Sequence, residues 1–595
     1  TTGNQNVAIG AYALTAANAG DYNVAVGLQA LSTQNAGSAG VDMYNTALGY
    51  KAGKDVTTGV RNTITGALAG DALTTGGYNV AAGMQALSTL TTGSKNVALG
   101  TSALEIFNVA GDGHNTAVGY AAGQLMTTGI RNTLIGSLAG DALTTGVQNV
   151  AIGAFALTSE DAHGKNVAIG YSALLLQDAG ADAYNVAIGY DSGVAVTTGI
   201  QNVLVGATAG DAISTGSFNT VLGYAALGAE DTHSGNTAIG NSALMLQNAG
   251  ADAYNTMVGY NTGKGLTTGV QNTGVGSFAM DATMSSNFNV AVGTYAMSAS
   301  TTSANSVAIG WQAMGVGVTT GDDNIAIGKS AGAALTTGAD NILIGSLSGD
   351  ALVNGTRNVA IGSNALSTED SGAKNVAVGW SSLQTLNYNG DGFNTAVGYH
   401  SGQAMVTGIK NTLIGANAGD SLTTGPENVA IGYNALTTED TNGRNVAVGS
   451  DALATLNAGV EAYNVALGYS TGYSMTTGVR NTLLGAVAGD SITSGSYNTL
   501  SGYASGDAMT SASYNCLYGY EAGFNLTTGT FNVAMGYGAL KLEDTGHRSI
   551  AIGAAALGVQ NSDTTNYNIG IGYEAGGAIN TGVQNVIVGN LAAKA

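Results

Sequence analysis

Residues 132–153 read NTLIGSLAGDALTTGVQNVAIG and contain two copies of one five-residue motif. The general form is N-[VTI]-x-[IVL]-G, and with close variants it occurs 34 times along the chain, with Ser306 and Ser549 in place of the leading Asn. Most steps between copies have the length of the step from Asn132 to Asn149, and six are longer by two positions. Self-similarity at a fixed short period is the signature of a repeat architecture, so residues 1–595 are predicted to form one continuous repeat domain.

A second period lies on top of the first. The residues after the motif Gly read xxAL in two successive units and xxAG in the next two, so that four units make one super-repeat. The AGD motif shows this spacing, because Asp71, Asp141 and Asp211 follow one another at intervals of one super-repeat. The sequence therefore predicts groups of four coils that repeat as a block.

The residue after the leading Asn or Ser is β-branched in 33 of the 34 copies, with Cys516 as the exception, and β-branched residues favour an extended strand. A 17-residue period with a Gly after each strand is typical of one turn of a β-solenoid. We therefore expect an all-β fold, a parallel β-solenoid of about 34 coils, forming a rod of roughly 160 Å at the usual strand spacing. Side chains alternate along a strand, and we expect the first and third positions, such as Val7 and Ile9, to fill the interior.

The middle position of the motif is then expected to point outwards. It is apolar in all 34 copies, and 21 of them are Ala. A continuous apolar stripe of this size is rarely exposed on a soluble monomer, so we expect this row to be an oligomer seam against another copy of the chain. The alternative is an exposed, Ala-rich flat sheet. The seam residues named from the sequence are Ala8, Ala25, Leu134, Ala151, Leu204 and Leu413.

The leading Asn is expected to form a ladder along the turns. A side-chain amide at a repeated turn can bond the backbone of its own and of neighbouring coils. The representatives are Asn6, Asn23, Asn132 and Asn149. The alternative for this row is a sugar-binding surface.

Composition excludes several classes of partner. The net charge of −21 argues against binding nucleic acid or an anionic membrane, and no long apolar run predicts a membrane-inserted segment. The five His residues show no metal-binding spacing and are expected in solvated loops, and no acids, bases or nucleophiles converge. We therefore expect no catalytic residues, no cofactor-binding residues and no enzymatic activity.

Two oxygen-rich loops are the exception. Calcium prefers carboxylate and carbonyl oxygens, and it is the one cofactor that these loops suggest. The candidate ligands are Glu160, Asp161, Asp178 and Asp182. The same long loops are the expected receptor contacts, because binding residues concentrate on loops, and the residues named for this are Asp178, Asp182 and Tyr184.

The motifs NVAIG and NSVAIG, with xxAL segments and short Gly-containing turns, resemble the head repeats of YadA-type trimeric autotransporter adhesins. Runs such as NTAVGYxAG are also similar to repeats of bacteriophage tail fibres. The resemblance spans the chain and implies a left-handed β-roll, three chains side by side around an axis, and a role in attachment. The YadA-type repeat is shorter than the repeat of this chain and has Ser more often before the strand.

The leading hypothesis is the structural shaft of an extracellular attachment fibre, most similar to a phage tail fibre, on a virion or cell surface. The alternative is a bacterial surface adhesin or a self-assembling extracellular filament. The expected partners are further copies of the chain, in a homotrimer, and a cell-surface receptor or glycan. Because no polar end cap is recognisable, we also expect that the repeat continues into a longer chain or meets another unit end to end.

Overall fold

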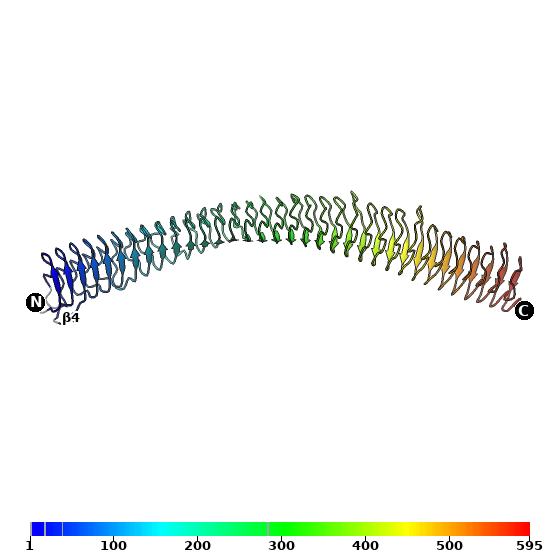
Figure 1. The fold of residues 1–595 in the computed structure, drawn as a ribbon, viewed down its shortest axis with the longest axis horizontal. Coiled ribbons are helices and arrows are strands. Elements are labelled where there is room, and N and C mark those ends of the chain that lie inside the picture. Colours follow the sequence, from blue (N-terminus) through cyan, green and yellow to red (C-terminus); the bar gives the residue numbers. More distant parts are fainter. Residues whose placement is uncertain (1–2, 17–19, 39, 283–284, 595) are drawn as a thin grey trace. The chain divides into compact units, whose positions relative to one another are not determined.

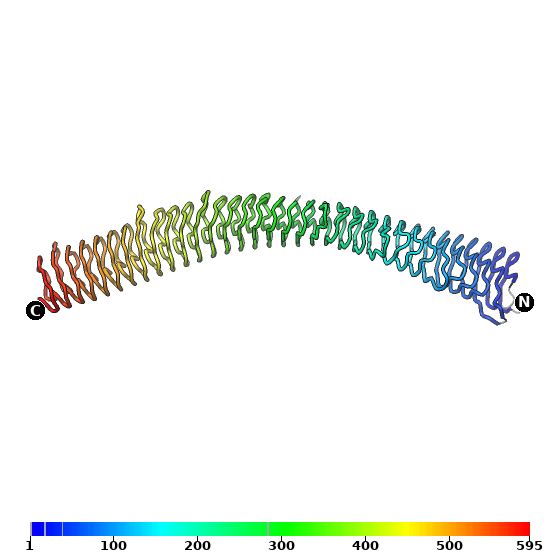
Figure 2. The backbone as a smooth tube through the Cα atoms, turned by 180° about the vertical axis from the view of Figure 1, so that it is seen from behind, coloured from blue at the N-terminus to red at the C-terminus, as the bar shows by residue number. Residues whose placement is uncertain are grey.

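A computed structural model describes residues 3–16, 20–38, 40–282 and 285–594 of the chain. The chain divides into two compact units, Thr1–Tyr295 and Ala296–Ala595. In each unit, short strands stack side by side with one strand in each coil, and the tube view shows the coils following one another along the chain (Figures 1 and 2). The described residues form no helix that could cross a membrane.

The described residues of the first unit contain one three-residue strand in each coil and one additional short parallel pair, β2 with β4. The strands are β1 (Val7–Ile9), β2 (Gly20–Asp21), β3 (Val24–Val26), β4 (Val41–Asp42), β5 (Thr46–Leu48), β6 (Thr63–Thr65), β7 (Val80–Ala82), β8 (Val97–Leu99), β9 (Thr116–Val118), β10 (Thr133–Ile135), β11 (Val150–Ile152), β12 (Val167–Ile169), β13 (Val186–Ile188), β14 (Val203–Val205), β15 (Thr220–Leu222), β16 (Thr237–Ile239), β17 (Thr256–Val258), β18 (Thr273–Val275) and β19 (Val290–Val292).

The second unit continues the same pattern. Its strands are β20 (Val307–Ile309), β21 (Ile325–Ile327), β22 (Ile342–Ile344), β23 (Val359–Ile361), β24 (Val376–Val378), β25 (Thr395–Val397), β26 (Thr412–Ile414), β27 (Val429–Ile431), β28 (Val446–Val448), β29 (Val465–Leu467), β30 (Thr482–Leu484), β31 (Thr499–Ser501), β32 (Cys516–Tyr518), β33 (Val533–Met535), β34 (Ile550–Ile552), β35 (Ile569–Ile571) and β36 (Val586–Val588).

Neighbouring strands pair in parallel and in register. Between β10 and β11, for example, Leu134 lies opposite Ala151 and Ile135 lies opposite Ile152. Within each unit, each motif therefore stacks on the same motif of the next coil, which confirms the predicted all-β parallel solenoid with one motif in each coil.

The interior of the coil holds the middle residue of the strand and not its two neighbours. The middle residue is buried in every three-residue strand except β1, where Ala8 is exposed together with the rest of the strand. Ile135, at the third position of β10, is 37% exposed, whereas Leu134 is fully buried. The prediction that the first and third positions fill the interior was therefore wrong.

The predicted oligomer seam is wrong for the same reason at five of its six residues, whereas Ala8 is exposed. Side chains that are buried within their own coil cannot contact another chain. The seam residues buried in this way are Ala25, Leu134, Ala151, Leu204 and Leu413. The alternation of the motif was predicted correctly, but it was assigned to the wrong faces.

The narrow interior explains why the middle residue is so often Ala. In coils of the xxAL type, an Ala at the strand centre shares the interior with a buried Leu, as Ala81 does with Leu87. In the last coil of most xxAG pairs, a large strand residue fills the space that glycines leave, as Leu134 does in β10. A Cβ placed on Gly123 or Gly140 would lie 2.7 or 2.9 Å from a methyl carbon of Leu134. The large side chain thus comes from the xxAL segment in some coils and from the strand centre in others. Either arrangement keeps the core of the coil close-packed.

The Gly after each strand allows the coils to stack closely. Gly136 has a φ of 142°, and a Cβ built on it would lie 2.4 Å from the carbonyl oxygen of Gly153 in the next coil. A side chain at this position would meet both an unfavourable backbone conformation and a backbone atom that cannot move away.

Candidate functional site

The outer face of the strands is the largest candidate interaction surface. The first position is Val, Thr or Ile in almost every strand, and the third is mostly Ile, Val or Leu. Both positions are accessible in the single chain, and exposed examples are Ile188 at 37%, Val203 at 41% and Leu222 at 47%. We call the first- and third-position side chains of the three-residue strands the strand face. A parallel sheet is normally covered on both of its faces, and here one of the two apolar faces is open to solvent.

The predicted Asn ladder is present. Asn132 accepts the backbone N–H of Asn149 at Oδ1 (2.9 Å) and donates from Nδ2 to the carbonyl oxygen of Gly146 (2.8 Å). Asn6 makes the same two contacts, with the N–H of Asn23 (2.8 Å) and the carbonyl of Gly20 (2.9 Å). The ladder satisfies turn groups of successive coils, and this is a structural role.

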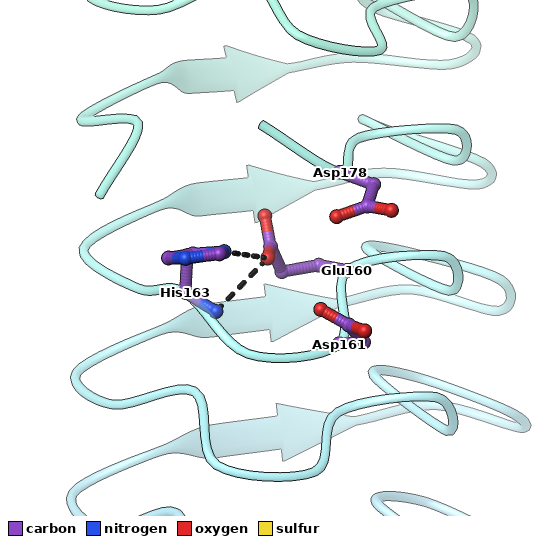
Figure 3. Close-up of side chains that lie close together, drawn as sticks. All are labelled: Glu160, Asp161, His163 and Asp178. Atoms are coloured by element: carbon purple, nitrogen blue, oxygen red, sulfur yellow. Dashed lines mark hydrogen bonds and ion pairs between the residues drawn. The ribbon is translucent and has the colours of Figure 1, made fainter. Parts of the chain in front are cut away.

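The side chains most suited to chemistry gather in the loops of two neighbouring coils. Glu160, Asp161 and His163 lie in the loop between β11 and β12, and Asp178 lies in the following loop, between β12 and β13 (Figure 3). One possible ligand atom from each of the four residues lies within 4.8 Å of the other three. We call these four residues the Glu160 cluster.

Glu160 is fully buried, although it is an acid. Its Oε1 accepts the backbone N–H of His163 (3.0 Å), and the Nδ1 of His163 lies 3.6 Å from the same oxygen. Burial raises the pKa of Glu160 above its usual range, and the charges of Asp178 and Asp161 add to this effect. The carboxylate is therefore held in a position where its negative charge is costly.

One hydrogen bond recurs wherever the sequence repeats the Glu-Asp pair. In it, Oε1 of the Glu accepts the backbone N–H of the residue three positions later. It is 3.2 Å in length at Glu230, 2.6 Å at Glu369, 3.2 Å at Glu439 and 2.7 Å at Glu543. The first oxygen of each Glu therefore stabilises its loop. The second oxygen differs between coils. That of Glu369 accepts the N–H of Tyr388, whereas three others have no hydrogen-bond partner among the described residues, and these belong to Glu160, Glu230 and Glu439.

A second, smaller cluster lies one super-repeat further along the chain. Glu230, Asp231 and His233 bring their ligand atoms together in the same way. The His233 Nδ1 lies 2.8 Å from Oε1 of Glu230. Asn248 occupies the position that corresponds to Asp178, so this cluster has one carboxylate fewer.

Asp182, the fourth calcium ligand named from the sequence, does not belong to the Glu160 cluster. Its carboxylate is 2.6 Å from Nζ of Lys165, and this contact lowers the pKa of Asp182. Lys165 also donates to the Tyr184 hydroxyl (2.9 Å) and lies 4.9 Å from the centre of its ring. The structure therefore does not bring Asp182 together with the other three candidate ligands, and its carboxylate pairs with Lys165.

Sequence reasoning missed His163 and His233, which it placed in solvated loops. The signal that could have found them is the register, counted from the leading Asn of each coil. Glu160 and Glu230 stand at the register where the corresponding coil near the start of the chain has Leu90. A carboxylate at a core position, followed three residues later by His, marks a buried polar cluster.

The chain matches no protein-family model, and no curated protein is detectably similar to it.

Proposed function

We propose that the chain is the structural shaft of an extracellular attachment fibre and that several copies assemble side by side through the strand face. The observation that carries the proposal is the open apolar face of a parallel sheet. Its rows of Val, Ile and Leu run through coil after coil in each unit, and large exposed apolar patches mark sites of association.

The area of the strand face is sufficient for a stable interface. If each strand contributes two side chains that each lose on the order of 40 Å², ten strands bury on the order of 800 Å² per chain, the size of a standard interface. Assembly would also protect a long parallel sheet from uncontrolled association. The number of three chains follows from the resemblance to YadA-type heads and tail fibres, and the strand face replaces the middle-position seam as the proposed contact.

Exposed aromatic rows support an attachment role. Tyr171 and Tyr190 stack with their ring centres 5.6 Å apart. In the second unit Tyr503, Tyr520 and Tyr537 form a continuous stack with distances of 5.2 and 5.4 Å. Such platforms provide the flat, partly polar surfaces that suit sugar rings, so a cell-surface glycan is the proposed receptor class.

The experiment is a mass measurement of the purified chain by light scattering without denaturant. One chain has a mass of 58.6 kDa, and a mass of about three times this value is expected. A mass of two chains would retain the strand-face contact and refute the trimer, whereas a single-chain mass would refute the assembly.

A pair of double variants locates the contact. Ile188→Lys with Leu222→Lys places two charges on the strand face and is expected to give single chains. The control is Leu125→Lys with Leu246→Lys, at positions that are 48% and 43% exposed but lie outside the strands. The control should keep the wild-type mass. Equal masses for the two double variants would place the contact elsewhere.

A further inference from the structure

The Glu160 cluster contains a buried acid that the fold itself does not require. At the same register, counted from the leading Asn, the corresponding coils have Leu90 and Ser300, both fully buried. The coil therefore folds in the same way with an apolar or a small polar residue at this position. A carboxylate here needs a favourable partner, because a buried charge is unfavourable unless it is paired.

The structure supplies that partner only in part. Oε1 of Glu160 accepts the His163 N–H, but Oε2 is buried and has no hydrogen-bond partner among the described residues. At Glu543 the corresponding oxygen accepts from Gln560 (2.8 Å) and Asn566 (2.9 Å). The same site can therefore be satisfied by amide donors, and the Glu160 cluster offers acids and a His in their place.

Asp178 adds a further negative charge where the other coils avoid one. It stands directly after Gln177 in a 19-residue coil, and the five other coils of this length have Asn at the register of Asp178. Those residues are Asn108, Asn248, Asn387, Asn457 and Asn561. Asp178 thus completes a group of three carboxylates within 4.8 Å of one another, which repel each other unless a cation lies between them.

The fourth member is a nitrogen ligand. The Nδ1 of His163 is buried and accepts no hydrogen bond within the described part of the chain, although the ring as a whole is partly exposed. An imidazole among carboxylates suits a first-row transition-metal ion, whereas calcium is bound by oxygen ligands alone.

We propose that Glu160, Asp161, His163 and Asp178 bind one divalent transition-metal ion of the zinc class. The ion joins two successive coils, because three ligands come from one loop and Asp178 comes from the next (Figure 3). The cluster of Glu230, Asp231 and His233 binds the same ion more weakly, since Asn248 stands in place of the third carboxylate. This assignment is independent of the fibre proposed above.

The test is calorimetric titration of the metal-free full chain with Zn²⁺, with Ca²⁺ titrated in parallel. The wild type is expected to bind one Zn²⁺ per chain tightly and to bind Ca²⁺ much more weakly. Asp178→Asn and His163→Ala should each weaken tight binding by about tenfold or more, since each removes a ligand. Asp182→Asn is the matched control, because Asp182 pairs with Lys165, and it should bind as the wild type does.

A gain-of-function variant keeps the test independent of folding losses. Asn248→Asp reproduces the four-residue set at the second cluster and is expected to raise the number of tight sites from one to two per chain. Circular dichroism verifies that every variant is folded. The assignment is overturned if the wild type does not bind Zn²⁺, if Ca²⁺ binds as tightly, if Asp178→Asn and His163→Ala bind like the wild type, or if Asn248→Asp adds no site.

Discussion

Leu134 and Ile135 are adjacent in β10 and test which face of the strand lies inside the coil. Leu134 is fully buried, whereas Ile135 is 37% exposed. Leu134→Ala removes a side chain that lies over Gly123 and Gly140, and neither glycine has a side chain that could move into the space. The cost should therefore be in the usual range for a buried Leu that leaves a cavity, about 3–4 kcal/mol.

Ile135→Thr is the matched comparison, because Thr65 already occupies the third position of β6. Threonine keeps the β-branched shape and leaves the interior unchanged, so the expected cost is about 1 kcal/mol or less. The assay is hydrogen exchange of backbone amides between positions 116 and 170, which reports the local free energy of opening, together with denaturant unfolding. Dilute conditions keep assembly out of the comparison.

A compensating substitution tests whether the large side chain can be moved from the strand centre to the segment that faces it. Gly140→Leu added to Leu134→Ala recreates the arrangement of Ala81, Leu87 and Leu90 found in another coil. The backbone permits it, since Gly140 has a φ of 56° and Leu87 a φ of 52°. About half of the lost stability should return, because the space over Gly123 stays empty. A cost under about 1 kcal/mol for Leu134→Ala, or no recovery in the double variant, would refute the packing argument.

The turns and the charges allow three further tests. Asn132→Ala leaves the N–H of Asn149 and the carbonyl of Gly146 unpaired and should cost about 2–4 kcal/mol by denaturant unfolding, and Asn132→Ser should cost less; equal losses would argue against the ladder. Gly136→Ala should cost about 3 kcal/mol or more, whereas Gly180→Ala, with a φ of 67° and no atom within 4 Å of the new Cβ, should cost about 1 kcal/mol. The thermal midpoint should rise as the pH falls from 7 through the raised pKa values of the buried carboxyls, because a carboxyl whose pKa is raised by burial binds its proton more tightly in the folded state, and this contribution is lost as the pH rises through the folded pKa. Below about pH 4 the stability should fall again, as carboxylates whose pKa is lowered by ion pairs, such as Asp182, take up protons; a midpoint that decreases steadily from pH 7 would contradict this. The carboxyls with a pKa raised by burial are Glu160, Glu369, Glu439, Asp71, Asp141, Asp211, Asp281, Asp350, Asp420, Asp490 and Asp507.

The positions of the strands could be predicted from the sequence because the repetition provides the same information many times. Each strand begins directly after the leading Asn or Ser, as β10 does after Asn132. The Asn ladder could be predicted for the same reason, since one amide at one register can bond only the coils next to it. A single copy of the motif would have supported neither prediction.

The inside and outside of the strand could not be determined from the motif, because all three positions are mostly apolar. Alternation separates two faces but does not say which of them the coil encloses. The side chain that faces the strand across the interior shows which face is enclosed. Leu87 fills most of the interior and leaves room only for a small residue such as Ala81, whereas Gly140 leaves a space that Leu134 fills. This relation appears in the sequence only when the strand centre is compared with the residue six positions later.

The candidate metal site illustrates how a repeat protein carries its own controls. Repetition explains most residues of a coil as architecture, and the coils that lack a given residue show what the fold can do without. Leu90 shows that the buried position of Glu160 does not need an acid, and Asn248 shows that the position of Asp178 does not need one either. Where two such departures converge with a His in one loop pair, stability alone does not account for them. A bound cation accounts for Glu160, His163 and Asp178 together. One super-repeat further on, the cluster of Glu230, Asp231 and His233 has one ligand fewer, so that the metal affinities of the two clusters can be compared.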